Sequence, residues 1–234
     1  MAGAAGGRQV EQDAEDYRIN VPNIDNLRDR LRERALALGA DYFGVADLSR
    51  VHDFVRDQGG EMMAQFPRAV SIGVVMPSAI VDRLPHHADG RVAAAYRSHG
   101  YEILNRRLDD VASGLSSTLQ RAGYRAFPVP ASQTVDEERL LGLFSHKLAA
   151  HLAGLGWIGK SCLLVMLEVG PRVRWASVLT DAPLMAGEPL EERCGECRGC
   201  VEVCPVGAFS GRSFFSDEPR AARFDVFKCR YYHS

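Results

Sequence analysis

The stretch Cys194-Gly-Glu-Cys197-Arg-Gly-Cys200-Val-Glu-Val-Cys204-Pro205 is the most informative part of this sequence. The spacing C-x2-C-x2-C-x3-C-P is that of a ligand run for an iron–sulfur cluster. The irons of such a cluster lie close together, so short loops must direct successive thiolates at one point. The first three cysteines wrap one cluster, whereas the fourth begins the next turn and points away from it. The run therefore predicts a small C-terminal iron–sulfur segment.

Zinc is the alternative ligand for this run. Zinc sites usually separate two C-x2-C pairs by a dozen or more residues, and they do not need the Cys-Pro that ends this stretch. Extracellular disulfide frameworks instead spread their cysteines along the chain to staple loops. The crowding therefore favours an iron–sulfur cluster in a reducing compartment.

A second cysteine run, which would complete a two-cluster ferredoxin, is absent. The chain has six cysteines, and Cys229 is the only other one near the run. We expect one cluster, of [4Fe–4S] type or in a [3Fe–4S] or incompletely ligated form. Three cysteines would hold it, and the last two could add a pair to a second site. The candidate metal ligands are Cys194, Cys197, Cys200, Cys204 and Cys229.

Composition excludes several classes of protein. The chain has 234 residues, of which 46% are hydrophobic and 25% charged, as in a globular protein. Its net charge of −2 argues against a duplex nucleic acid partner, although a local basic patch could still hold RNA. No apolar run approaches the ~20 residues of a membrane span, and the first sixteen residues lack a signal-peptide core. We expect a cytoplasmic protein with no membrane partner.

Hydrophobic periodicity predicts an α/β (α+β) fold with a mobile tail at residues 1–20, an α/β domain at 21–190 and a ferredoxin-like segment at 191–234. Helices are expected near residues 24–38, 91–121 and 140–153. Strands are expected at residues 41–46, 69–76 and 124–129, and a hairpin is expected to join 163–167 to 172–179.

The glycine loop Gly154-Leu-Gly156-Trp-Ile-Gly159-Lys160-Ser161 matches both the dinucleotide-binding and the P-loop patterns. Each of those motifs follows a strand and opens a helix. Here the preceding residues are helical in pattern and the following ones resemble a strand. We therefore interpret the loop as a tight helix-to-strand turn, from which Trp157 and Lys160 could face an anionic or aromatic ligand.

Several segments together resemble the epoxyqueuosine reductase family, over roughly residues 96–229. They are Ala153-Gly-Leu-Gly-Trp-Ile-Gly-Lys160, Gly170-Pro-Arg-Val-Arg174, Val178-Leu-Thr-Asp-Ala-Pro-Leu184 and the cysteine run. The chain departs from the family at residues 127–135, which lack the family's acidic residue, and in having no second cysteine run. We expect a paralogue that is shortened at its C-terminus.

The resemblance implies a flavin-reductase/nitroreductase-like mixed sheet flanked by helices, and cobalamin as a cofactor beside the [4Fe–4S] cluster. Related domains occur in reductive dehalogenases. The resemblance also places the glycine loop and residues 128–135 beside the organic cofactor, and His146 and Lys147 lie just before that loop. The candidate cofactor-binding residues are His146, Lys147, Gly154, Gly156, Trp157, Gly159 and Lys160.

The expected function is an iron–sulfur oxidoreductase that passes electrons to a corrinoid or another organic cofactor, which performs the bond-breaking chemistry. Its electron donor would be a ferredoxin or flavodoxin. The substrate, a small molecule or a modified base, and the catalytic residues are unknown. The alternative is an electron carrier or reductase partner without a substrate of its own.

Overall fold

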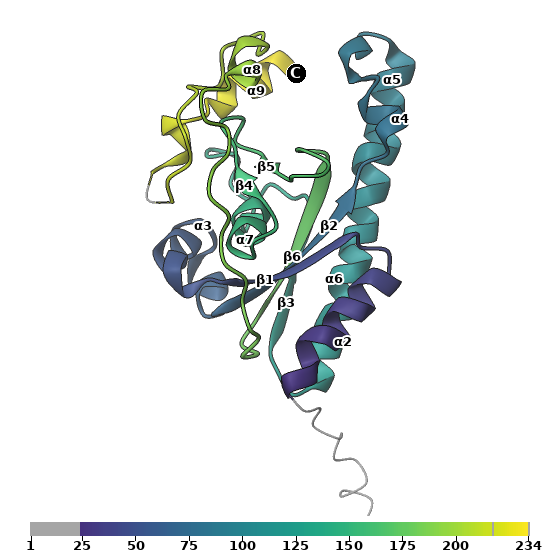
Figure 1. Ribbon diagram of the computed structural model, residues 1–234, viewed down its shortest axis with the longest axis vertical. Helices are drawn as coiled ribbons and strands as arrows, with labels where there is room; N and C mark the ends of the chain where they lie inside the picture. Colours follow the sequence, from purple (N-terminus) through teal and green to yellow (C-terminus); the bar gives the residue numbers. More distant parts are fainter. Residues whose placement is uncertain (1–23, 217, 234) are drawn as a thin grey trace, which may run out of the picture.

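A four-stranded antiparallel sheet forms the centre of the protein, as the computed structural model shows for residues 24–216 and 218–233 (Figure 1). The central strands, β2 (Arg68–Val75) and β6 (Val173–Thr180), are buried along almost their whole length, because helices cover both faces of the sheet. In the spatial order β1-β2-β6-β3, the strands are β1 (Tyr42–Asp47), β2 (Arg68–Val75), β6 (Val173–Thr180) and β3 (Ala126–Val129).

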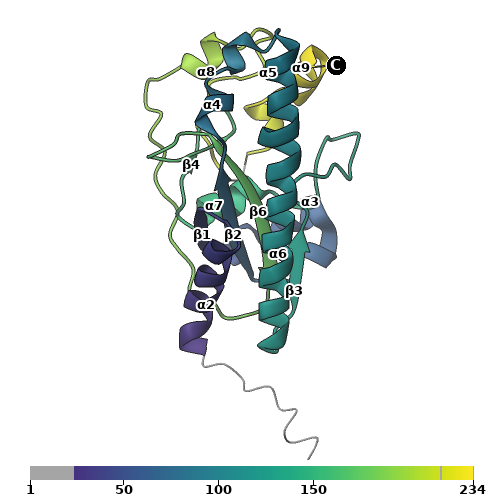
Figure 2. The ribbon, with the colours of Figure 1, turned by 90° about the vertical axis from the view of Figure 1, so that its right-hand side faces the viewer.

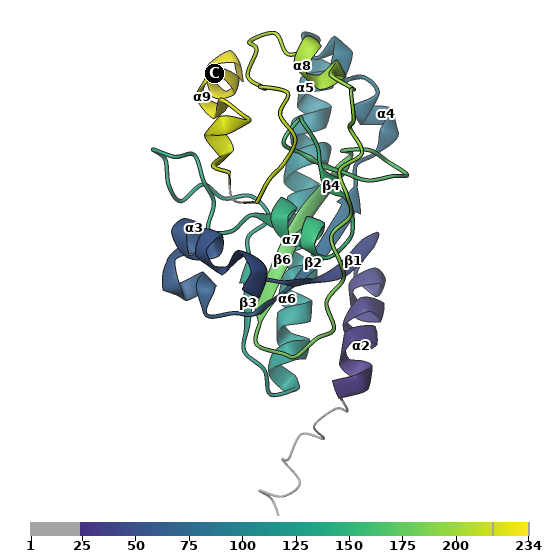
Figure 3. The same cartoon turned by 60° about the vertical axis from the view of Figure 1, so that its left-hand side comes forward.

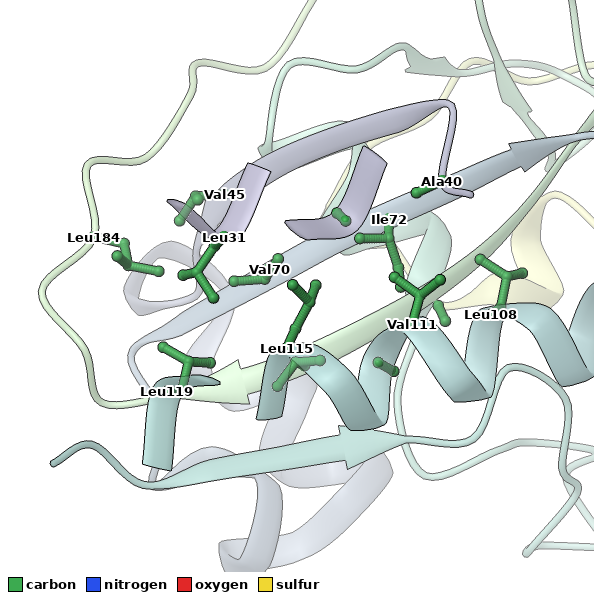
Figure 4. Close-up of a cluster of buried hydrophobic side chains, with 14 of the residues drawn as sticks. Leu31, Ala40, Val45, Val70, Ile72, Leu108, Val111, Leu115, Leu119 and Leu184 are labelled. Carbon is green, nitrogen blue, oxygen red and sulfur yellow. The ribbon is translucent and has the colours of Figure 1, made fainter. Parts of the chain in front are cut away.

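Helices α2 (Ile24–Ala37) and α6 (Leu104–Arg121) cover one face of this sheet (Figure 2). The apolar stripe of α6 faces inward at the expected helical spacing. Figure 4 shows side chains of this stripe directed toward Val70 and Ile72 of β2. The stripe residues, each at most 1% exposed, are Leu104, Leu108, Val111, Leu115 and Leu119.

The opposite face carries helix α7 (His146–Leu152), which packs against β1, and the kinked helix α3 (His52–Ala64) (Figure 1). A second hydrophobic core lies here and includes Phe144, Leu148 and Trp175. The sequence pattern did not predict helix α3. The helix is kinked at Gly60, which has a φ of 66°. A glycine pair breaks the apolar periodicity there.

The remaining elements are short. The predicted helical region at 91–121 is confirmed as a succession of α5 (Gly90–Ala95), the π-helical η3 (Tyr96–Ile103) and α6. No helix in the described part of the chain is long and apolar enough to cross a membrane. The short elements are η1 (Ser49–Val51), α4 (Ser78–Val81), η2 (Leu84–His86), α5 (Gly90–Ala95), the π-helical η3 (Tyr96–Ile103), β4 (Trp157–Ile158), β5 (Leu164–Val165), α8 (Gly199–Glu202), η4 (Arg220–Ala222) and α9 (Val226–His233).

The sheet is antiparallel at every described pairing, whereas a mixed sheet was expected. Strands β2 and β3 do run in the same direction, joined through α6 as in a crossover unit, since each is antiparallel to β6. The later strand β6 inserts between them, so the two parallel strands never pair. The α/β class with flanking helices is confirmed.

Two local predictions were wrong. The segment at 163–167 does not form a hairpin with β6, because the turn that starts at Gly159 folds β5 back onto β4 instead. The helix expected at 140–153 begins only at His146, where the Ser145 side chain accepts a hydrogen bond from the backbone N–H of Leu148. Before that cap, Leu140 has a φ of 51°, which no α-helix contains.

Residues 182–194 lead from the sheet along α7 to the cysteines and α8 (Figure 3). The backbone N–H of Gly187 donates to the carbonyl of Val45 at 2.8 Å, and Arg50 forms an ion pair with Glu188 at 2.9 Å. These contacts fix the path of the connection. The predicted tail at residues 1–20 lies outside the described residues, and the boundary at residue 190 stays a prediction.

Candidate functional site

The glycine loop is a helix-to-strand turn, as the sequence predicted. Helix α7 ends before Gly154, whose φ of 76° favours glycine, and β4 follows. A Cβ at Gly154 would lie 2.5 Å from the carbonyl oxygen of Glu188, and one at Gly156 would collide with that of Val165. Both glycines therefore allow backbone segments to pack closely. The order helix–turn–strand argues against a phosphate-binding P-loop.

Lys160, at the end of this loop, holds the cysteine segment in place. Its side chain is only 8% exposed, and its Nζ donates hydrogen bonds to the carbonyl oxygens of Gly195 at 2.5 Å and Cys197 at 3.3 Å. Charge-assisted bonds of this kind are about twice as strong as neutral ones. The lysine therefore anchors the first turn of the cysteine run to the α/β body.

Trp157 and Gly159 approach Cys194 from the same loop. A Cβ at Gly159 would lie 3.3 Å from the Cys194 sulfur, so glycine permits this close approach. Burial raises the pKa of Cys194, whereas the backbone N–H of Lys160 and the indole N–H of Trp157 act to lower it. That indole N–H is buried and otherwise lacks a hydrogen-bond partner. The loop thus presents donors to the first cysteine of the run.

Cys204 and Cys229 lie close enough for their charges to interact. Burial and the nearby Cys204 raise the pKa of Cys229. Burial alone would raise the pKa of Cys204, but backbone N–H groups lower it overall, including that of Ala208, which lies 3.3 Å from the sulfur. Such donors stabilise a thiolate, the form that binds metal.

The cysteine segment is chemically suited to an iron–sulfur cluster. None of the described cysteines is in a disulfide. The available metal ligands are thiols. N–H groups point at the sulfurs of Cys194 and Cys204, and Lys160 holds the backbone of the run at Gly195. No three described His, Cys, Asp or Glu side chains lie within reach of one metal ion. A cluster held by the first three cysteines would therefore need their thiols to move together, which would couple folding of the segment to cluster binding.

The opposite pKa shifts of this pair give a pH-dependent prediction for the metal-free chain. At a given pH the lowered pKa of Cys204 leaves more of it as thiolate, so iodoacetamide should label it at lower pH than Cys229. Mass spectrometry of labelled peptides across pH 6–10, a range chosen to bracket an ordinary thiol pKa of about 8.5, measures both midpoints. Equal midpoints, or Cys229 reacting first, would contradict the assignment of N–H donors to Cys204.

A cavity of about 1220 Å³ lies on the other side of the glycine loop. Its wall includes residues of α3, of 138–148, of 214–216 and of 218–227, and the loop contributes Ile158 and Cys162. Trp157 and Ile158 are neighbours in β4, so their side chains point to opposite sides. The glycine loop therefore separates the cavity from the cysteine segment while touching both.

His146 and Lys147 are the two predicted cofactor-binding residues that line this cavity. The Nε2 of His146 donates to the carbonyl of Pro130 at 3.0 Å, and its Nδ1 accepts from the Ser177 hydroxyl at 3.0 Å. Burial lowers the pKa of His146, which keeps the ring neutral. Because both ring nitrogens are hydrogen-bonded, His146 can hold the cavity wall in place but has no lone pair free for a metal.

The other five predicted cofactor-binding residues are placed differently. They lie outside both described cavities and pack against the cysteine segment, its connection or β5. The sequence pattern identified the loop but not the side it faces, because its partners are some 35 residues further along the chain. A direct contact with an organic cofactor stays a prediction for them. They are Gly154, Gly156, Trp157, Gly159 and Lys160.

Residues 129–134 line a separate cavity of about 190 Å³. The expectation that the 128–135 loop and the glycine loop line one cleft is not confirmed. His146 lines both cavities, so the two spaces meet at this residue.

Sequence reasoning missed Arg220 and Arg223 in the wall of the large cavity. Arg223 is 7% exposed, and its guanidinium lies 4.6 Å from the centre of the Phe214 ring. A signal existed, because two arginines three residues apart share one face of a helical turn. Nothing in the sequence placed that face against Lys147.

Comparison with known proteins agrees with an iron–sulfur cluster at the cysteine segment. The family described as "4Fe-4S binding domain" matches residues 189–210. An epoxyqueuosine reductase of Pseudomonas aeruginosa is 29% identical over 180 residues, covering 74% of this chain and 46% of the relative. That of Gloeobacter violaceus is 28% identical over 219 residues, covering 93% and 61%. The chain thus spans about half the length of the first of these relatives.

Solved structures show the same fold. A selenomethionine-labelled epoxyqueuosine reductase aligns with a TM-score of 0.54 at 21% identity, covering 80% of this chain and 54% of the other. A reductive dehalogenase, whose structure is discussed in terms of B12-dependent dehalogenation, aligns at 0.58 and 19%, covering 86% and 28%. Neither of these two structures is described as a nitroreductase, so the expected nitroreductase-like sheet is not confirmed.

One relative corrects an expectation about partners. An epoxyqueuosine reductase structure that aligns with a TM-score of 0.54 at 22% identity, covering 80% of this chain and 53% of the other, contains an epoxyqueuosine-modified tRNA stem loop. Overall net charge therefore does not exclude structured nucleic acid as a partner of this fold, because binding depends on local charge. Together, the sequence and structure matches confirm that the chain is similar to the epoxyqueuosine reductases, the family that its motifs resemble.

Proposed function

We propose that this chain is an iron–sulfur oxidoreductase of the epoxyqueuosine reductase type, in which a cluster at the cysteine segment exchanges electrons with an organic cofactor in the large cavity. One observation carries the proposal: the glycine loop touches both. Gly159 and Lys160 contact the cysteine segment, whereas Ile158 and Cys162 line the cavity. Electrons crossing between the two sites would traverse a single turn of backbone.

Cys194, Cys197 and Cys200 would hold the cluster, and Cys204 and Cys229 would supply a ligand pair beside it. When bound, the cluster supplies one-electron transfer, with each electron coming from a ferredoxin- or flavodoxin-like donor. The chain's own residues set its environment. N–H donors directed at cluster sulfur raise a cluster's reduction potential, and Trp157 and the Lys160 backbone supply such donors at Cys194.

The cavity fits a large organic cofactor. Typical small-ligand pockets measure about 300–1,000 Å³, and this one has about 1220 Å³. We propose cobalamin, in line with the epoxyqueuosine reductase and B12-dependent neighbours. His146 and Lys147 would position it together with aromatic wall residues. A bound corrinoid would supply the low-potential, bond-breaking chemistry. We also propose that the sheet is related to that of nitroreductases. The proposed substrate is a modified tRNA base.

A second candidate is an electron carrier without a substrate of its own. It is favoured by residues 127–135, which contain no carboxylate where the family has its acidic residue. A carrier needs no proton donor at that position.

Cobalamin binding separates the two candidates. Hydroxocobalamin titrated into the anaerobically prepared full-length chain should give a saturable change in the corrinoid spectrum. Leu141→Trp, which adds bulk in the cavity wall, should weaken binding at least tenfold, whereas Leu36→Trp on the exposed side of α2 should not. No spectral change, or equal binding by both variants, would overturn the cavity assignment and leave the carrier.

A further inference from the structure

Three cationic side chains meet in the wall of the large cavity. The Nζ of Lys147 donates to the carbonyl of Cys162 at 2.6 Å, and Nη1 of Arg223 lies 3.9 Å from the sulfur of the same residue. Arg220 reaches this point from η4 and donates to the carbonyls of Arg139 and Leu140. Cys162 has a φ of 56°, a conformation that β-carbon-bearing residues rarely adopt. The three cations thus converge on one strained turn.

These cations have no carboxylate partner among the described residues. Acidic side chains do line the cavity, but Asp53, Asp57, Glu218 and Asp225 pair with other bases, and Glu138 is exposed. Arg223 is only 7% exposed, and its Nε is buried without a hydrogen-bond partner. Buried charges are normally paired, so this arrangement lacks an anion.

Cys162 does not supply that anion. Burial raises the pKa of its thiol, and the surrounding cations offset this only in part, so it is neutral near pH 7. Burial also lowers the pKa of Lys147, and Arg220 and Arg223 lower it further. The two guanidinium groups therefore disfavour the charged form of Lys147 until a negative group joins them.

We infer that Lys147, Arg220 and Arg223 form a binding site for a phosphate group carried by an organic ligand. Three cations exceed the single charge of a carboxylate, whereas a phosphate monoester carries about −1.5 to −2 near pH 7 and has three acceptor oxygens. Guanidinium groups match such oxygens with two parallel N–H donors, and the lysine adds a point charge. The inference does not depend on the proposed redox function, because it requires neither iron nor a corrinoid.

Calorimetric titration of the full-length chain at fixed ionic strength tests this site. The probes are inorganic phosphate, adenosine 5′-monophosphate and sodium acetate. Saturable phosphate binding that acetate does not reproduce is the expected result. Tighter binding of the nucleotide than of phosphate would identify a phosphomonoester ligand, and equal binding would identify free phosphate as the ligand and overturn the organic part of the inference.

Variants connect the binding to these side chains. Lys147→Gln and Arg220→Gln should each weaken phosphate binding about tenfold, the loss expected for one charge-assisted interaction. Arg50→Gln is the matched control, since Arg50 lines the same cavity but already pairs with Glu188. If Lys147→Gln does not fold, Arg220→Gln still tests the site, because Arg220 is only half-buried. Absent phosphate binding in the parent chain, or an equal loss in the Arg50 variant, would overturn the site.

Discussion

Cys200→Ser is expected to abolish stable cluster binding. The cysteine belongs to the trio that wraps the cluster, and a hydroxyl is a far weaker iron ligand than a thiolate. Only two thiolates of the trio would remain on that cluster. After anaerobic reconstitution and desalting, the variant should lose most of the protein-bound iron and sulfide and the broad visible absorption of the parent chain.

Cys162→Ala is the matched control for this prediction. Cys162 is the remaining cysteine, lies in the cavity wall and is 5% exposed, so its removal should leave the iron content unchanged. Loss of iron in this variant, or its retention in Cys200→Ser, would contradict the assignment of the cluster to the cysteine run.

Lys160→Met should release the cysteine segment from the α/β body. The substitution keeps an apolar side chain of similar length but removes both bonds to the carbonyls of Gly195 and Cys197. Two bonds from a charged donor are worth about 1.5 kcal/mol or more each, which corresponds to roughly a hundredfold change in equilibrium. Iron release to a chelator should accelerate by up to this factor.

The comparison variant is Lys228→Met. Lys228 is exposed in the same C-terminal segment and lies 3.9 Å from Asp225, so its removal should change the release rate little. The Lys160 variant should also bind ATP no differently from the parent chain, because the loop lacks the strand–helix order of a P-loop. Equal iron release from both lysine variants would contradict the anchoring role.

The sequence predicted the elements whose signal is local. The α6 stripe repeats every three or four residues, and each of its leucines is buried as expected. The cysteine run identified the cluster segment because ligand spacing is itself a local property. The run of apolar residues in β2 likewise predicted a strand covered on both faces.

What the sequence could not predict depends on contacts between distant residues. Strand β6 inserts between β2 and β3, and no periodicity encodes that neighbour. The glycine pattern of residues 154–159 did not reveal whether the loop faces a ligand or the cysteine segment. The cations of the cavity are separated by more than seventy positions, from Lys147 to Arg220, so only the fold brings them together.

The iron and sulfide content of the anaerobically reconstituted chain, measured together with its visible and electron paramagnetic resonance spectra, tests the central claim most directly. The cysteine inventory predicts one cluster, with about three to four irons and four sulfides per chain and a [3Fe–4S] or [4Fe–4S] signal. About eight irons and eight sulfides would contradict it, because five thiolates cannot ligate two complete cubanes. Stoichiometric zinc without sulfide would contradict the iron–sulfur assignment itself.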